Sequence, residues 1–234
     1  MIDLLGIIYP VRCPVCDRIL RFGGDKICAS CYHQLEYVRE PCCKKCGKQI
    51  LKQEEEYCFD CGKKNHAYEK GIALLQNKGA GKKSIYAVKY HNKREYVDFY
   101  TDELVKRYKK EITSWKADML VPVPLHHKKK ITRGFNQADT IAVGLGRKLG
   151  IPVRKHVLKR VINTRPQKEL DDTLRKKNLE KAFIVSKNVV ELKRIILVDD
   201  IYTTGSTIDA CAGVLKQAGA DRVYYISLGI GSGY

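Results

Sequence analysis

The sequence predicts an α/β fold with a mostly parallel sheet flanked by helices, preceded by a small cysteine-rich module. Two observations support this prediction. In the second part of the chain, short apolar runs alternate with segments of helical periodicity, as strands and crossover helices do in a parallel sheet. The first 61 residues contain nine of the ten cysteines, and eight of these form four CxxC pairs. We expect one domain over 1–68 and a second over 69–234.

The N-terminal cysteines form two modules of equal spacing. Each module contains two CxxC pairs with eleven residues between them, and the modules resemble each other beyond the cysteines. A CxxC turn offers two thiolates at the separation that tetrahedral Zn²⁺ requires, and four thiolates complete its coordination. We therefore expect a double zinc ribbon holding two structural zinc ions. The expected ligands are Cys13, Cys16, Cys28 and Cys31, and then Cys43, Cys46, Cys58 and Cys61.

Other uses of these cysteines explain the pattern less well. Disulfides are rare in cytoplasmic proteins, and a redox role does not account for four CxxC pairs at matched spacing. Ligand pairs could interleave between the modules, and Cys42 could chelate in place of Cys43. His33 and His66 follow CxxC pairs and are expected at the surface rather than at a metal. Cys211 is expected to be a small buried residue.

Strands and helices alternate after the cysteine modules. The expected strands span 72–75, 120–124, 153–158, 183–185, 195–198 and 223–228. The expected helices span 84–108, 135–149 and 208–218. Four aromatic residues of the first helix could stack on nucleic-acid bases, although packing into the core is the favoured interpretation. They are Tyr86, Tyr90, Tyr96 and Phe99.

The most informative segment is 194–207, RIILVDDIYTTGST. Its apolar run is typical of a buried central strand, and Asp199 and Asp200 follow where open α/β sheets bind ligands. A turn rich in hydroxyls then leads into a helix, so backbone N–H groups and the positive end of a helix dipole are at hand for a phosphate. The turn consists of Thr203, Thr204, Gly205, Ser206 and Thr207. The pattern favours a sugar phosphate over a plain strand–turn–helix with an Asp-rich cap.

A second polar segment, 121–138, follows the strand at 120–124 and reads VPVPLHHKKKITRGFNQA. A basic loop at the carboxyl end of a strand is well placed to hold a second anion, and a solvated surface loop is the alternative. The candidate anion-binding residues are Pro122, Val123, Pro124, Leu125, His126, His127, Lys128 and Arg133.

Charge and hydropathy limit the possible functions. The formal net charge is +18, more than a small phosphorylated ligand requires, so a polyanion such as nucleic acid is a reasonable partner and a merely basic soluble surface is the alternative. No apolar run approaches the roughly 18 residues of a membrane helix. The N-terminus lacks the features of a signal peptide, so we expect a cytoplasmic protein without membrane insertion.

The segment 194–207 resembles the signature of type I phosphoribosyltransferases, which binds 5-phosphoribosyl-1-pyrophosphate (PRPP). The resemblance implies that Asp199 and Asp200 bind the ribose and act in catalysis, that 203–207 binds the 5′-phosphate, and that the basic loop contacts pyrophosphate. The polar segment 159–183 could then be a mobile hood over the ligand, or else an exposed helical excursion. The candidate hood residues are Arg160, Thr164 and Gln167.

Taken together, the motifs resemble the ComF family. They are the cysteine ribbon, KYHNKREY at 89–96, VPVPL…RGFNQA, and NTRPQ…NL..AF followed by VDDIYTTGST. The resemblance implies a type I phosphoribosyltransferase-like fold that binds PRPP with Mg²⁺. It also implies a role with single-stranded DNA during DNA uptake in natural competence, with a ComFA-like competence helicase as partner. A genuine phosphoribosyltransferase of nucleotide salvage is the alternative, and the motifs name no acceptor.

Overall fold

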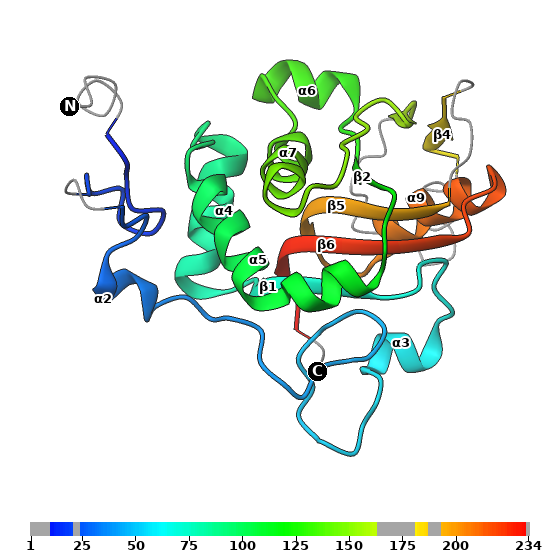
Figure 1. Ribbon diagram of the computed structural model, residues 1–234, viewed down its shortest axis with the longest axis horizontal. Helices are drawn as coiled ribbons and strands as arrows, with labels where there is room; N and C mark the ends of the chain where they lie inside the picture. Colours follow the sequence, from blue (N-terminus) through cyan, green and yellow to red (C-terminus); the bar gives the residue numbers. More distant parts are fainter. Residues whose placement is uncertain (1–9, 21–23, 163–180, 187–192, 233–234) are drawn as a thin grey trace, which may run out of the picture.

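A computed structural model describes residues 10–20, 24–162, 181–186 and 193–232 (Figure 1). Its main sheet has four strands in the order β1-β6-β5-β2, and all three neighbouring pairs are parallel. The strands are β1 Gly71–Gln76, β2 Met119–Pro122, β5 Arg194–Tyr202 and β6 Arg222–Ile230. The structure therefore confirms the predicted α/β class with a mostly parallel sheet.

Both faces of this sheet are covered, as the continuous apolar runs of β5 and β6 require. Alternate residues of β5 point to opposite sides. Ile196 and Val198 join a core cluster with three helices, whereas Ile195 and Leu197 join a second cluster with α9 and the second cysteine module. The helices of the first layer are α4 Gly79–Tyr90, α5 Tyr96–Ser114 and α7 Gln137–Leu149, and α9 spans Ser206–Gln217.

Two expected elements differ from the structure. The helix expected over 84–108 is divided into α4 and α5, and the break contains Asn92 in the left-handed region at φ 55°. Asparagine tolerates this conformation better than most residues do, which makes it a suitable interruption. The sequence signal for one long helix was therefore the sum of two amphipathic helices that share a core.

The second difference is that no strand spans 153–158 as the sequence predicts. Only Val153 bridges the main sheet, next to Leu120. A separate antiparallel pair forms later, between β3 Leu158–Arg160 and β4 Phe183–Val185. The polar run at 154–156 interrupts the apolar pattern, and the chain turns there instead of continuing along the sheet edge.

Each cysteine module brings its four thiols together, with the ligand sets that the spacing predicts. The four Sγ atoms in each set lie within 4.8 Å of one another. Zn–S bonds of about 2.3 Å in a tetrahedron place the sulfurs about 3.8 Å apart. The Cys16–Cys28 and Cys46–Cys58 Sγ separations are 3.8 Å and 3.7 Å, so both clusters fit a structural zinc ion. The Cys42 thiol instead donates to the Arg39 carbonyl at 3.2 Å.

The two modules share one local architecture. In each, an isolated antiparallel bridge closes the first CxxC turn, Arg12 to Ile19 and Cys42 to Gln49. In each, a short helix begins directly after the third cysteine and carries the fourth, α2 Ala29–Tyr32 and α3 Phe59–Lys63. The internal repeat predicted from the cysteine spacing is therefore a repeat of structure.

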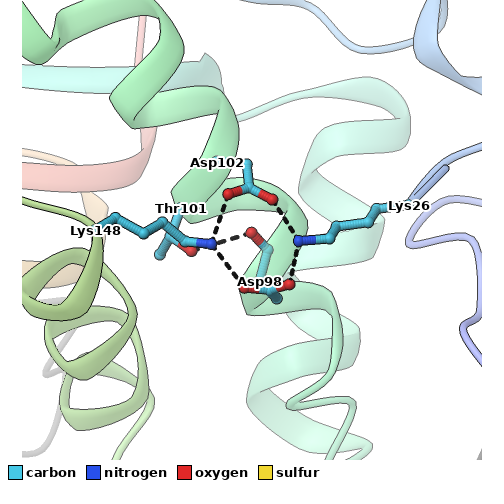
Figure 2. A network of polar contacts seen from close by, with 5 residues as sticks. All are labelled: Lys26, Asp98, Thr101, Asp102 and Lys148. Atoms are coloured by element: carbon cyan, nitrogen blue, oxygen red, sulfur yellow. Dashed lines mark hydrogen bonds and ion pairs between the residues drawn. The ribbon is translucent and has the colours of Figure 1, made fainter. Parts of the chain in front are cut away.

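The first module is attached to the rest of the molecule by polar contacts (Figure 2). Lys26 lies between Asp98 and Asp102 of α5, and its Nζ is 2.5 Å from Asp102 Oδ2. Lys148 of α7 approaches the same carboxylates at 2.8 Å and 2.5 Å. Asp17 nearby accepts hydrogen bonds from Lys93 and Tyr96. Pairs as exposed as these contribute about 0–1 kcal/mol each, so they orient the module more than they stabilise it.

The second module, in contrast, belongs to the hydrophobic core. Cys43, Cys46 and Cys58 are at most 1% exposed and share a buried cluster with Leu197 and Tyr225 of the sheet.

Within the described residues, every helix is too short or too polar to traverse a lipid bilayer.

This asymmetry predicts unequal effects of removing zinc. Cys43→Ser with Cys46→Ser should lower the melting temperature of the whole protein, because the second cluster packs against the sheet. The matched pair Cys13→Ser with Cys16→Ser should lower it much less. Zinc content measured by mass spectrometry, together with calorimetric unfolding, checks both. Equal melting temperatures for the two variants would contradict the asymmetric packing.

Candidate functional site

The candidate site lies where β5 leaves the sheet. The sequence predicts a strand that ends just before the acids. Strand β5 instead continues through Asp199 and Asp200 to Tyr202. Successive residues of a strand face opposite sides, so the two carboxylates have different surroundings. Asp200 is 9% exposed, and Asp199 is more accessible.

Asp200 is paired with a lysine from the neighbouring helix. The Nζ of Lys89 in α4 lies 2.9 Å and 3.1 Å from the two carboxylate oxygens. Burial disfavours the charged ammonium, but attraction to Asp200 outweighs burial and raises the pKa of Lys89. Lys89 is therefore held as a cation against the Asp200 carboxylate. Lys89 was not among the expected site residues, although it opens the KYHNKREY motif.

Within the described part of the chain, no ion pair like that of Asp200 is formed by Asp199. One of its oxygens accepts a hydrogen bond from the Asp200 N–H at 2.8 Å. Desolvation and the Asp200 charge raise the pKa of Asp199 to about 7, against weaker opposing effects of Lys89 and Arg160. The adjacent acids thus differ in their surroundings: Asp200 is paired with Lys89, and Asp199 is poised to gain or lose a proton near neutral pH.

The turn after β5 depends on a glycine. Gly205 adopts φ 80°, and a Cβ placed there would lie 2.3 Å from the Tyr202 hydroxyl. It is the N-cap residue of α9 and supplies no side-chain hydrogen bond, so the first N–H groups of the helix are left for a ligand. Thr204 and Ser206 hydroxyls lie 3.0 Å apart around it. The exposed Thr203 and Thr204 complete the turn that the sequence predicts to bind a phosphate.

Aromatic rings support this turn from below. Tyr202 stacks on Tyr225 with ring centroids 4.7 Å apart, and its hydroxyl lies 2.8 Å from that of Tyr68. The Tyr225 hydroxyl in turn donates to the carbonyl of Cys46 at 2.6 Å. The candidate phosphate turn therefore rests directly on the second cysteine module.

A second link joins this module to α9 and corrects an expectation. His66 is not a surface residue, since its side chain is 1% exposed. Its Nε2 lies 3.4 Å from Cys61 Sγ and its Nδ1 lies 2.5 Å from a carboxylate oxygen of Asp209, in the first turn of α9. The other Asp209 oxygen accepts the Ala67 N–H at 3.0 Å. A histidine that contacts a thiolate ligand and a carboxylate orients that ligand.

The basic loop is shorter than expected, because helix α6 His127–Arg133 begins inside it. His126 caps this helix by accepting the Lys128 N–H. The expected anion-binding residues thus divide between the end of β2, an extended stretch up to His126, and the first turn of α6. His127 and Lys128 are exposed there, and Val123 continues the sheet by donating to the Val198 carbonyl at 2.9 Å.

Local contacts explain several residues of the RGFNQ string. Gly134 ends α6 in the left-handed conformation, and Asn136 caps α7 while donating to the Val123 carbonyl at 3.0 Å. Gln137 Nε2 donates to the Lys89 carbonyl at 3.3 Å, and Arg133 donates to Gln137 Oε1 at 3.2 Å. The string therefore positions the lysine that pairs with Asp200.

The expected hood is described only in part. Arg160 in β3 lies over the ring of Phe183 at 5.2 Å, and its charge acts to lower the pKa of Asp199. The same charge, together with desolvation, lowers the pKa of His126. The Arg160 charge therefore acts on both the basic loop and Asp199. Thr164 and Gln167 fall outside the described residues.

Similar proteins were found for both parts of the chain. A family model described as a double zinc ribbon domain matches residues 4–62. Competence protein F of Haemophilus influenzae is 40% identical over 108 residues, which are 45% of this chain and 47% of that protein. The DNA utilization protein YhgH of Salmonella typhi is 39% identical over 106 residues, 45% and 46% of the two chains. Competence protein ComFC of Streptococcus pneumoniae is 33% identical over 118 residues, 50% of each.

The matched region thus spans about half the length of these relatives. Among solved structures, adenine phosphoribosyltransferase from Leishmania tarentolae aligns over 62% of this chain and 74% of its own, at 15% identity and a TM-score of 0.39. Orotate phosphoribosyltransferase from Aeropyrum pernix covers 58% and 60%, at 16% identity and a TM-score of 0.34. Scores this low carry no argument, so the site rests on its own geometry.

The sequence relatives and the paired zinc ribbon agree on one assignment. The relatives are two competence proteins and a DNA utilization protein, each at least 33% identical over the matched region. The double zinc ribbon occupies residues 4–62, and both of its four-cysteine clusters are formed. Together these findings support a ComF-family protein.

Proposed function

We propose that this protein binds PRPP or a related phosphoribosyl ligand at the end of β5 and acts on single-stranded DNA during DNA uptake. One observation carries the ligand assignment. Asp200, paired with Lys89, and Asp199, a titratable acid, stand directly before a glycine turn that opens onto the N-terminus of α9. Carboxylates that accept vicinal hydroxyls beside a phosphate-binding turn match the two ends of a phosphoribosyl group.

Each part of the site has a task in this proposal. The turn 203–207 holds the 5′-phosphate through backbone N–H groups and hydroxyls. Asp199 and Asp200 accept hydrogen bonds from the ribose hydroxyls, and Lys89 holds the Asp200 carboxylate in place. When bound, Mg²⁺ neutralises the pyrophosphate oxygens and takes most of its ligands from the substrate and water.

The basic side of the site suits the pyrophosphate end of the ligand. His127 and Lys128 at the start of α6 are exposed, and Arg133 at its end acts electrostatically on Lys89. Positive groups at this position stabilise charge on a departing pyrophosphate, should a transfer occur. The proposal assigns the ligand and leaves the acceptor unspecified.

The DNA assignment rests on charge and on the relatives. The net charge of +18 greatly exceeds what a single phosphoribosyl ligand needs. Relatives named for competence and for DNA utilization share the matched region. A basic protein gains affinity for a polyanion by releasing its counterions.

Replacing both acids should abolish ligand binding. Asp199→Asn with Asp200→Asn removes both charges, replaces one acceptor oxygen of each acid by a donor NH2 and leaves Lys89 without its ionic partner, so PRPP affinity measured by calorimetry should fall at least about a hundredfold. The exposed Asp221→Asn is the matched control and should bind normally. Unchanged affinity of a folded double variant for PRPP would refute the ligand assignment.

Ligand binding should also depend on pH through Asp199, whose pKa lies at about 7. Below neutrality this carboxyl is protonated and becomes a poorer acceptor for the ribose hydroxyls. PRPP affinity should therefore fall as the pH is lowered from about 8 to about 6, and Asp199→Asn should lose most of that dependence. Because the ligand's own phosphate also titrates near pH 6, the comparison with the variant isolates the Asp199 contribution.

A stability measurement gives this prediction an independent control. The pKa of Asp199 is about 7 when folded and 3.8 ordinarily, so the unfolded chain binds fewer protons between these values and stability decreases as the pH rises through them. Asp199→Asn should accordingly raise the melting temperature at about pH 8 more than at about pH 5. Equal shifts at both pH values would mean that Asp199 does not titrate near neutrality.

Single-stranded DNA should bind with a strong dependence on salt. Each backbone phosphate neutralised on a single strand adds about −0.7 to the slope of log K against log salt concentration. We expect a slope of about −3 or steeper for a fluorescent oligonucleotide followed by anisotropy, and no such slope for PRPP measured alongside. Absence of binding at low salt would refute the DNA assignment and leave the ligand assignment standing.

A further inference from the structure

We propose that single-stranded DNA is bound on one defined face of the protein, which we call the α4–α6 surface. It consists of exposed tyrosines of α4, the arginine at the end of α6, and a basic pocket beside them. Its residues are Tyr86, Tyr90, Arg94, Lys130, Arg133, Phe135 and Lys155. This inference rests on the proposed DNA role and adds the location and mode of binding.

Two tyrosines that the sequence predicts in the core lie in solvent instead. Tyr86 and Tyr90 are 42% and 56% exposed, whereas Tyr96 and Phe99 of the next helix are buried. One helical turn apart on α4, the two rings lie with centroids 5.4 Å apart and are tilted by 41°. Paired exposed rings offer faces on which unpaired bases stack, and such stacking tolerates any base sequence.

An arginine completes this aromatic platform. The Arg133 guanidinium lies 4.8 Å from the centroid of the Tyr90 ring and donates to the Tyr90 hydroxyl at 3.3 Å. A guanidinium held over an aromatic ring keeps its outer N–H groups available for phosphate oxygens. The contact also joins α6 to α4, which Figure 1 shows as neighbouring helices.

A basic pocket continues the platform on the other side of α6. Its volume is about 410 Å³, and its walls include Arg94, Lys130 and Lys155. Arg94 lies over the ring of Phe135 at 4.0 Å, a second cation stacked on an aromatic ring. The pocket contains one acid, Asp139, whose pKa is raised by burial. Three cations against one acid favour an anion in this pocket.

The platform and the pocket form one path. Tyr90 and Arg94 are four residues apart across the turn between α4 and α5, and Arg133 and Phe135 are separated only by Gly134. The two arginine–aromatic pairs therefore sit side by side where α6 meets α7. A strand stacked on the tyrosines can continue with its backbone along Arg133 toward the pocket.

The chemistry favours single strands over other polyanions. Duplex DNA hides its base faces, so exposed tyrosines would contribute little to binding a duplex. An acidic protein segment would use the cations but would gain little from the rings. The combination of stacked aromatic residues with cations is the arrangement by which proteins bind single strands.

Removing the rings should weaken binding without changing its ionic component. Tyr86→Ala with Tyr90→Ala should lower the affinity for a fluorescent oligothymidylate about 5- to 100-fold at fixed salt, with an unchanged salt slope. Tyr86→Phe with Tyr90→Phe should retain most of the affinity, because the rings remain. The exposed Tyr57→Ala is the matched control and should bind as the wild type does.

Reversing the pocket charges should instead change the ionic component of binding. Lys130→Glu with Lys155→Glu should make the salt slope less steep by about 1.4, the contribution of two phosphates. Lys109→Glu with Lys110→Glu on α5 makes the same change in net charge at another exposed position and should leave the slope nearly unchanged. PRPP binding should be normal in both lysine variants.

The outcomes separate this inference from the proposed function. If the wild type binds oligothymidylate and the tyrosine and pocket variants bind equally well, the α4–α6 surface is wrong and the DNA role stands. If the wild type does not bind, both are overturned. If a polyglutamate peptide competes as well as oligothymidylate and the tyrosine variant makes no difference, the surface is an acidic-protein site and this inference is refuted.

Discussion

Packing of the second zinc ribbon against the sheet is the contact on which the candidate site depends. Tyr202, the last residue of β5, lies between the phosphate turn and this ribbon, stacked on Tyr225, whose hydroxyl bonds to the carbonyl of Cys46. A small module of this kind has too few apolar residues to fold alone. Metal binding typically contributes about 10–16 kcal/mol to the folding free energy of such modules. Zinc binding would therefore order one side of the core as well as its own ligands, and the turn packs on that side of the core.

The acid pair shows how the same backbone prepares two different carboxylates. Alternation along β5 places Asp200 against Lys89 of α4 and leaves Asp199 near the ligand space. A buried ion pair stabilises little in net terms, because desolvation offsets most of the attraction. The pair instead fixes the position of Asp200, and burial together with the nearby Asp200 carboxylate raises the pKa of Asp199. Gln137, by holding the Lys89 carbonyl, extends this arrangement to α7.

Most of the fold could be predicted from sequence because its signals are local. The apolar run of β5, the CxxC spacing and the glycine turn each depend on neighbouring residues, and the structure forms both cysteine clusters as expected. Long-range contacts gave no comparable signal. His66 was expected at the surface because nothing near it in sequence predicts its contact with Asp209. Lys89 and the exposure of Tyr86 and Tyr90 likewise depend on which helix face meets the sheet, and a break at Asn92 sets that face.

The two ribbons share one architecture but differ in the forces that hold them. Contacts of the first ribbon with α5 are charge pairs on partly exposed side chains, as between Lys26 and Asp102. Dissolved ions screen such contacts over a Debye length of about 8 Å at physiological ionic strength. The second ribbon adds apolar packing against the sheet, which salts excluded from protein surfaces strengthen. A salt of that kind therefore weakens the charge pairs of one copy of the repeat while it strengthens the apolar packing of the other, so two copies of one module respond differently to the same medium.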